Sequence, residues 1–211
     1  MRQMASTLRR VDVIEPAPAM SLRQTIAQAQ EWFGEDTAGV GAYNERVGVL
    51  VEVFGVHVGL ERETANRWAR AACLHDVGKL WVPADILLKR GPLSAEERHV
   101  MQQHTLVGCL RLYPVCEVAA TMALSHHENF DGSGYPYKLA GQAIPFAGRL
   151  VRLLDVYDAL RSLRPYKPAL SHDEAVGIML RGDERVRPTM FDPRLLHCFE
   201  QHHRLIEARY G

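Results

Sequence analysis

The feature that most constrains the fold of this chain is a helical spacing of apolar residues, which continues over most of its 211 residues. Apolar residues that recur every three to four positions form one face of a helix, and no alternating strand pattern of useful length competes with them. The pattern predicts helices over residues 21–33, 38–59, 62–75, 95–112, 115–127, 146–163, 171–181 and 193–208. We therefore expect an all-α fold of about seven to eight helices.

Several of these predicted helices begin with residues that cap a helix N-terminus. Ser94 and Ser171 are each followed by a glutamate three residues later, which is the spacing of a capping box. Asp192 places a capping carboxylate directly before Pro193, at the first helical position. The main irregular segment is Gly132 to Pro145, and we expect it to form a loop that shapes a site carried by the preceding residues.

The chain has the size and composition of one globular domain. Its 211 residues and 47% hydrophobic content are enough for a buried core. Residues 1–20 end in a proline-rich stretch and are expected to be a tail or linker, while residues 21–211 form the domain. The sequence has no run of about 18 apolar residues and no apolar signal-peptide core, so we expect a cytoplasmic protein.

The charges of the chain are balanced, with 25 basic and 25 acidic residues. No overall field therefore favours DNA or an anionic membrane as a partner, and an anionic ligand must be bound by local basic residues. The four cysteines form no CxxC pair and lie within helical patterns, so we expect buried thiols in a reducing compartment. They are Cys73, Cys109, Cys116 and Cys198.

Two clusters of polar residues interrupt the apolar pattern. His75 and Asp76 follow an apolar segment, and Lys79 comes within one turn of them. His126 and His127 precede the irregular loop. Since adjacent residues diverge by about 100° around a helix, these two imidazoles serve one site only near a helix end or across two ion positions. Either cluster alone also fits ordinary buried or solvated residues, but together they favour a polyvalent metal that meets a phosphate.

Two further residues are candidates for the same site. His104 lies in the middle of a predicted helix, where a core or surface histidine would be ordinary. Asp155 lies within the very apolar run from Leu150 to Tyr157. A buried carboxylate is costly unless it is paired or bound to a metal, so Asp155 is the strongest single-residue argument for an ion.

Taken in order, these motifs resemble the HD-GYP family, a branch of the HD-domain metal-dependent phosphohydrolases. The resemblance covers roughly residues 40 to 205, and so many ordered motifs would not arise from composition alone. It is carried by His75-Asp76-Val77-Gly78-Lys79, Ile86-Leu87-Leu88-Lys89, Gly91-Pro92-Leu93, His104, His126-His127-Glu128, Asp131-Gly132-Ser133-Gly134-Tyr135-Pro136, Asp155-Val156-Tyr157-Asp158-Ala159-Leu160 and Arg164-Pro165-Tyr166-Lys167-Pro168-Ala169.

The resemblance implies an HD-domain helical bundle with a GYP loop. It implies hydrolysis of a cyclic dinucleotide, chiefly cyclic di-GMP, to a linear dinucleotide or GMP at a centre of two or three metals, often Fe or Mn. Zn is also compatible with mixed imidazole and carboxylate ligands. Asp76 would bridge two ions, completed by His75 and Asp155 on one side and by His104, His126 and His127 on the other. The residues implied around the substrate are Lys79, Arg164, Lys167 and Tyr135, with Asp76 and Lys79 acting in catalysis.

The chain departs from the family at the first ligand positions in the sequence. The family has a histidine ligand three residues before an Arg-Val pair, and Arg46-Val47 puts Tyr43 at that position. Members with a third metal carry a glutamate four residues earlier, where this chain has Gly39. We therefore expect a binuclear centre, with Tyr43 as a divergent ligand or as a residue that fills the vacated space. His57 cannot replace the histidine, since fourteen residues of helix rise about 21 Å.

Tyr43 and Gly39 leave a second class of function open, a catalytically impaired signalling module that binds a cyclic dinucleotide or a protein partner. A third reading is an HD phosphohydrolase for another nucleotide, if the loop from Gly134 to Pro145 does not admit two bases. The GYP loop itself could contact signalling proteins or be only a structural turn. The oligomeric state is left open by the sequence.

Overall fold

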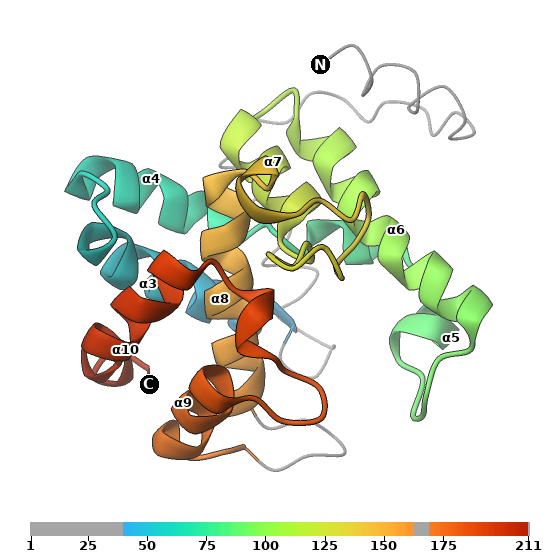
Figure 1. Cartoon of the computed structure of the whole chain (residues 1–211). Coiled ribbons are helices and arrows are strands. Elements are labelled where there is room, and N and C mark those ends of the chain that lie inside the picture. Colours follow the sequence, from blue (N-terminus) through green and yellow to red (C-terminus); the bar gives the residue numbers. More distant parts are fainter. Residues whose placement is uncertain (1–39, 163–168, 211) are drawn as a thin grey trace.

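The structure is a computed structural model that describes residues 40–162 and 169–210, with side chains from residue 45 onward. The all-α prediction is confirmed within these ranges, where the helices are joined by turns, loops and short 3-10 segments (Figure 1). The helices are α3 (Val40–His57), α4 (Arg62–Ala72), α5 (Ala84–Leu87), α6 (Ala95–Leu112), α7 (Glu117–Ser125), α8 (Phe146–Arg161), α9 (His172–Arg181) and α10 (Pro193–Glu207). The 3-10 segments are η2 (Val77–Trp81), η3 (Gly141–Ala143) and η4 (Pro188–Met190).

The predicted helix starts agree with the structure wherever a capping signal was present. Ser94 and Ser171 form complete capping boxes, and the Asp192 side chain accepts a hydrogen bond from the Arg194 amide. The prediction of 62–75 is wrong at its end, because α4 stops at Ala72. The short helix α5 was not predicted. The expected tail 1–20 and the expected helix 21–33 lie outside the described residues.

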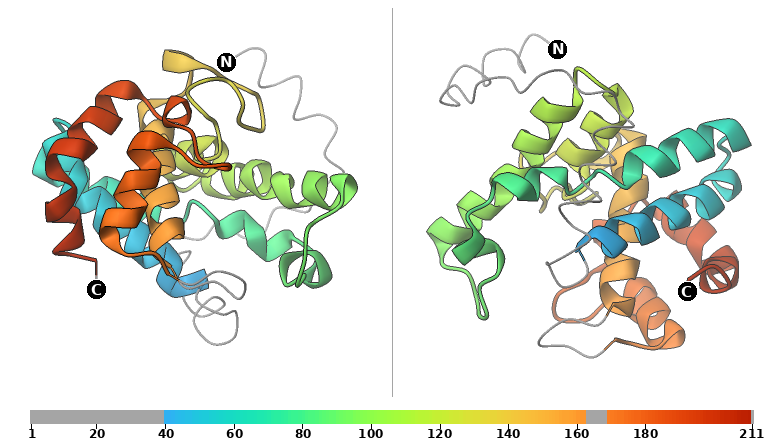
Figure 2. Two further views of the ribbon diagram at one scale, coloured as in Figure 1. Left: turned by 60° about the horizontal axis from the view of Figure 1, so that its bottom comes forward. Right: turned by 180° about the vertical axis from the view of Figure 1, so that it is seen from behind.

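The central element of the fold is α8, which contacts α3, α7, α9 and α10. Figures 1 and 2 show it running through the middle of the molecule, with α3, α4 and α10 on one side and α6 on the other. Most of its residues are buried, including the charged residues Asp155 and Asp158. A polar residue on such a helix is therefore held inside the protein, close to several other elements.

The core packs around the inner faces of α3, α8 and α10. Phe54, Tyr157 and Phe199 are fully buried and meet with edge-on ring contacts. Burying side chains of this size contributes about 1.5–3 kcal/mol each relative to exposure. After α3, Gly59 adopts a φ of 94°, a left-handed conformation that suits glycine, and the chain turns back into α4. This packing gives the polar residues described below a rigid frame.

The cysteines and the remaining histidines take ordinary structural places. All four cysteines are free thiols, as predicted, but the expectation of full burial is wrong because each is only partly buried. His172 is buried and shares hydrogen bonds with Tyr157 and His203. His57 and His202 stack on each other away from the site. Among the described residues, none of these histidines joins the metal-ligand cluster.

Candidate metal centre

His75 and Asp76 lie in the turn between α4 and η2, and not on the end of a helix as predicted. The backbone amide of His75 bonds to the carbonyl of Ala72, and the amide of Val77 bonds to that of Leu74. These bonds join residues three apart, so the backbone continues in one tight turn after α4 ends. Both side chains are consequently fixed at the buried inner end of α4, where His75 is fully inaccessible and Asp76 is 2% exposed.

Gly78 brings this turn against α6. A Cβ atom at Gly78 would lie 1.9 Å from the carbonyl oxygen of His104 and 2.7 Å from the amide nitrogen of Gly108. Only glycine permits this close approach of two backbones. The glycine of the His75 to Lys79 motif therefore sets the distance between Asp76 and His104, two residues that are far apart in the sequence.

His126 and His127 come together because α7 ends at them. The helix stops at Ser125, and His126 is its C-terminal cap residue. The two ring centroids lie 4.1 Å apart. This placement at a helix end is one of the two arrangements under which adjacent histidines were expected to serve one site.

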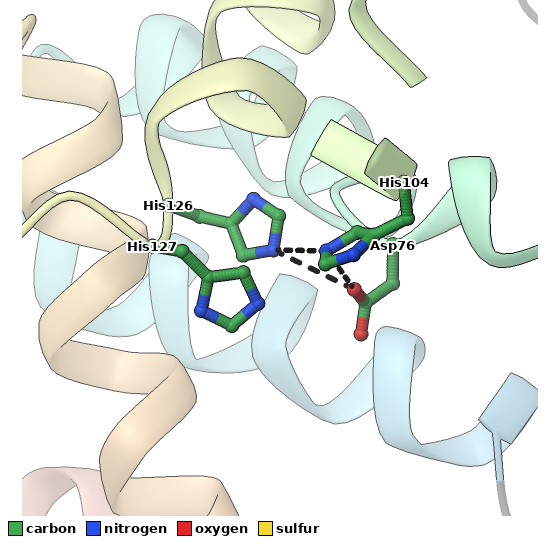
Figure 3. Close-up of side chains that lie close together, drawn as sticks. All are labelled: Asp76, His104, His126 and His127. Carbon is green, nitrogen blue, oxygen red and sulfur yellow. Dashed lines mark hydrogen bonds and ion pairs between the residues drawn. The ribbon is translucent and has the colours of Figure 1, made fainter. Parts of the chain in front are cut away.

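The four side chains that lie closest together are Asp76, His104, His126 and His127, whose candidate ligand atoms are all within 4.8 Å of one another. Oδ1 of Asp76 lies 3.4 Å from Nε2 of His104 and 3.5 Å from Nε2 of His126. Figure 3 shows the rings and the carboxylate converging. Two ligands that are each about 2.0–2.2 Å from one ion lie roughly 3 to 4 Å apart, so this spacing suits a shared transition metal.

Backbone hydrogen bonds orient the imidazoles of the site. Nδ1 of His75 bonds to the carbonyl of Ala72 at 2.7 Å, and Nδ1 of His104 to that of Met101 at 2.6 Å. Nδ1 of His126 lies 2.9 Å from the carbonyl of Ala123. A carbonyl only accepts, so each Nδ1 carries a hydrogen, and each Nε2 offers a lone pair when the ring is neutral. Metal-ligating histidines commonly have this second interaction.

Burial lowers the pKa of the three imidazoles in the cluster. The pKa of His104 falls to about 4, and that of His126 is lowered as well. For His127, burial and the neighbouring His126 and His104 hold the pKa well below its usual range. Neutral imidazoles are the form that binds metals.

The protein alone does not satisfy every polar atom of the cluster. Among the described residues, Oδ1 of Asp76 is buried and accepts no hydrogen bond, which costs about 1–3 kcal/mol. The nitrogen lone pairs of His104 and His126 face this oxygen, and such groups repel unless a cation lies between them. Their chemistry and spacing therefore fit a divalent transition metal.

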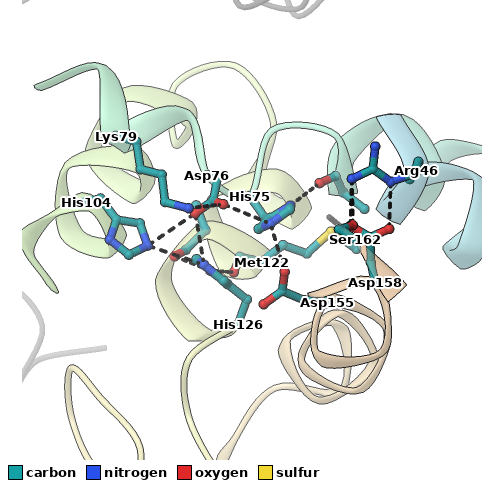
Figure 4. Close-up of polar contacts among 12 residues, drawn as sticks. Arg46, His75, Asp76, Lys79, His104, Met122, His126, Asp155, Asp158 and Ser162 are labelled. Carbon is teal, nitrogen blue, oxygen red and sulfur yellow. Dashed lines mark hydrogen bonds and ion pairs between the residues drawn. The ribbon is translucent and has the colours of Figure 1, made fainter. Parts of the chain in front are cut away.

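A second group of donors adjoins the first on the side of α8. Nε2 of His75 lies 3.4 Å from Oδ2 of Asp76 and 3.7 Å from Oδ1 of Asp155 (Figure 4). Burial lowers the pKa of His75, but the two carboxylates outweigh that effect and raise it to about 10. The two oxygens of Asp76 thus face different partners, as a carboxylate that bridges two ions would.

Lys79 places a positive charge at the edge of the centre. Its Nζ lies 2.5 Å from Oδ2 of Asp76, and the side chain is 24% exposed. Burial raises the pKa of Asp76, but Lys79 and His75 more than offset this and hold it well below its usual range. The ammonium group therefore faces both the buried carboxylate and the solvent side of the site, where a phosphate would approach.

The GYP loop, which is the irregular segment from Gly132 to Pro145, folds back over His126 and His127. The Tyr135 ring stacks on His127, with centroids 4.6 Å apart, and the Tyr135 amide bonds to the His127 carbonyl. A Cβ atom at Gly134 would lie 2.3 Å from the Asn129 amide nitrogen, so this position also needs glycine. Glu128, which is 1% exposed, accepts hydrogen bonds from the amides of Tyr137 and Leu139.

The structure thus brings together most of the predicted site residues. Tyr43, Arg164 and Lys167 lie outside the described side chains. Sequence reasoning assigned no role to Glu128, which organises the GYP loop, or to Gly78, which sets the spacing of α6. A carboxylate directly after two histidines and before a glycine-rich loop was the available signal for Glu128.

Comparisons with known proteins identify the family. Residues 21–195 match the model of the HD domain, which spans most of the chain, so this chain belongs to the HD-domain family and, by its ordered motifs, to the HD-GYP branch. Bd1817, an HDG"Y"P protein from Bdellovibrio bacteriovorus, shares the fold with a TM-score of 0.62 at 14% identity, over 87% of this chain and 63% of that one.

Curated relatives are similar in sequence over much of this chain. The cyclic di-GMP phosphodiesterase response regulator RpfG of Xanthomonas campestris is 38% identical over 82% of this chain and 46% of its own length. A cyclic di-GMP phosphodiesterase of Vibrio cholerae is 45% identical over 62% of this chain and 27% of its own. The chain thus spans less than half the length of these relatives. No helix in the described part of this chain is long and apolar enough to cross a membrane.

Proposed function

We propose that this chain is a metal-dependent phosphodiesterase that hydrolyses a cyclic dinucleotide, cyclic di-GMP in the first place, to a linear dinucleotide or GMP. The observation that carries the proposal is the convergence of Asp76, His104, His126 and His127 beside Lys79. Mixed imidazole and carboxylate ligands next to a lysine suit the binding of a phosphodiester at a metal. The names of the curated relatives support the choice of substrate class.

Two ions would share Asp76. Oδ1 would bind one ion with His104, His126 and His127, and Oδ2 would bind the other with His75 and Asp155. Fe and Mn are the metals we propose, and this ligand set also accepts Zn. When bound, such ions act as Lewis acids on a phosphoryl oxygen and make water nucleophilic at neutral pH.

The remaining residues bind and orient the substrate. Lys79, together with Arg164 and Lys167, would offset the charge of the phosphate. Tyr135 is held by its stack on His127 beside the centre and would pack against a base. Since the GYP loop carries the exposed ring of Tyr137, we propose it also as a surface for signalling proteins. The free thiols agree with a reducing compartment such as the cytoplasm.

The proposal is tested with anaerobically purified protein, by elemental analysis alongside turnover of cyclic di-GMP and of 3'3'-cGAMP. We expect at least one transition metal per chain and hydrolysis that disappears in Asp76→Ala. Arg70→Ala, a change of an exposed arginine on α4, is the control and should hydrolyse at the original rate. Binding of cyclic di-GMP without hydrolysis, in protein reconstituted with Fe or Mn, would favour the signalling module and overturn the enzyme.

A further inference from the structure

Arg152 lies on α8 three residues before Asp155, and residues at this spacing lie on the same face of a helix. Its side chain is half-buried and reaches from α8 to the segment that follows the double histidine. Sequence reasoning gave Arg152 no role, because it appeared only as a charge within an apolar run.

A chain of hydrogen bonds holds Arg152 in place. Its Nε donates to Oδ1 of Asn129 at 2.9 Å, and Nδ2 of the same amide donates to Oγ of Ser133 at 2.9 Å. The Ser133 hydroxyl in turn donates to Oδ1 of Asp131 at 2.5 Å. Because both ends of the Asn129 amide are engaged, its orientation is fixed, and the first residues of the GYP loop set the position of the guanidinium group.

Arg152 lies beside the candidate ligands of the centre. Its partner Asn129 follows His127 by two residues, and Asp155 lies one turn further along α8. The ammonium group of Lys79 lies at Oδ2 of Asp76. Two cations therefore border the metal ligands, one beside Asp76 and one between Asp155 and the segment that follows His127.

We propose that Arg152 binds the phosphate of the cyclic dinucleotide that is not cleaved. The inference rests on the proposed function. Both phosphodiesters of a cyclic dinucleotide belong to one ring, so when one lies at the metal ligands near Lys79, the other stays close by and needs its own positive partner. A guanidinium group anchored through Nε suits this task, since arginine stays charged and binds phosphate through hydrogen bonds in a fixed geometry.

The test compares two ligands that differ in this phosphate. Cyclic di-GMP and linear GpG both carry two guanines, but GpG has only one phosphodiester. Binding to Mn-loaded protein is measured for both by rapid mixing, before either ligand is hydrolysed, and chromatography of the same samples confirms that each ligand is intact. Arg152→Ala should weaken binding of cyclic di-GMP by roughly 10- to 100-fold, as expected for a lost charge-assisted hydrogen bond, and change binding of GpG by less than about twofold.

Two further variants separate the effect of the Arg152 charge from effects on folding. Arg152→Gln retains a side chain able to donate to Asn129 and should show the same selective loss through the missing charge. Arg70→Ala should bind both ligands as the unmodified protein does. Equal losses for the two ligands would assign Arg152 to the bases or to folding and overturn the proposal, as would unchanged binding of cyclic di-GMP. Selective binding loss in a protein that hydrolyses neither ligand would support Arg152 while refuting the enzymatic function.

Discussion

Asp155 and Asp158 lie one turn apart on α8 and both are buried, yet their carboxylates have opposite surroundings. Asp158 accepts hydrogen bonds at 2.8 Å from Nε of Arg46 and at 2.6 Å from the hydroxyl of Tyr210. Ser162 contributes a longer hydrogen bond. Asp155 instead faces the imidazole of His75, which also faces Asp76 (Figure 4).

The difference separates a structural carboxylate from a candidate ligand. Asp158 is surrounded by donors and ties α3 and the segment that follows α10 to α8, so its charge is neutralised within the protein. Asp155 belongs to a group of two carboxylates and several imidazoles whose charges and lone pairs are balanced best by a cation. Burial alone therefore does not identify a metal ligand; the groups that face the carboxylate do.

The largest effect is expected at Asp76, whose two carboxylate oxygens face the two groups of donors. Asp76→Ala should remove metal from both positions and lower the turnover of cyclic dinucleotide by a thousandfold or more, on the order of the several kcal/mol that a metal contributes to phosphoryl transfer. Elemental analysis should show a larger loss of metal in Asp76→Ala than in His75→Ala. Equal retention of metal in these two variants would show that Asp76 is not the bridging ligand.

Replacing each of the two aspartates on α8 by asparagine should separate their roles. Asp158→Asn turns an amide NH2 toward Arg46 and Tyr210 and removes a negative charge from a partly buried ion pair. We expect a loss of about 2–3 kcal/mol in the free energy of unfolding, below the full value for buried pairs because Arg46 is 30% exposed. Urea denaturation measures this loss, and the metal content of the folded protein should be unchanged.

Asp155→Asn should give the reverse pattern. Its metal content should fall, because an amide is a weaker ligand than a carboxylate, and in chelator-treated protein it should destabilise less than Asp158→Asn does. Loss of metal in both variants, or in neither, would remove the distinction between the two aspartates.

The sequence predicted the helices well and the site only in part, for physical reasons that differ. Helix starts are local: Ser94 and Ser171 bond to amides three residues away, so the capping pattern is visible in the chain itself. The convergence of Asp76 with His104 depends on two backbones meeting at Gly78, a contact between distant segments that no local pattern encodes. The resemblance to HD-GYP proteins supplied that missing tertiary information.

Neither local sequence patterns nor the family resemblance predicted a role for Arg152. Its partner Asn129 is 23 residues away in the sequence, and the residue belongs to none of the motifs that carry the resemblance. Only the path of the GYP loop reveals that the two side chains meet. The placement of α4 failed for a related reason, since the tight turn at His75 continues the apolar pattern although the helix ends at Ala72.

A smaller effect is expected at Tyr43, which the sequence places at a family ligand position. If the site lacks one ligand there, Tyr43→His should raise metal occupancy and phosphodiesterase rate together, by roughly tenfold in rate for one restored ligand. Metal stoichiometry and cyclic di-GMP hydrolysis are measured side by side with Fe and Mn. More metal without any turnover would instead indicate that the remaining pocket is a binding module.

The smallest effect is expected at Asp131. Like Asp158, this carboxylate is surrounded by hydrogen-bond donors, but it lies nearer the surface. Burial raises its pKa, but hydrogen bonds from Ser133, Thr189 and Arg187 lower it to about 2. Because the folded-state pKa lies below the ordinary value of 3.8, the carboxylate stabilises the fold above that value. This contribution is lost as the pH falls toward 2.

Solvent screening at this partly exposed group reduces the expected contribution to roughly 1 kcal/mol. Urea denaturation should therefore show Asp131→Asn less stable than the unmodified protein by about that amount at pH 6–7, with the difference shrinking as the pH falls below about 4. Asp85→Asn, a change of an exposed aspartate on α5, serves as the control and should show no such pH-dependent difference. A difference for Asp131→Asn that stays constant from pH 7 to 3 would mean that Asp131 acts through loop packing, and its likeness to Asp158 would then be lost.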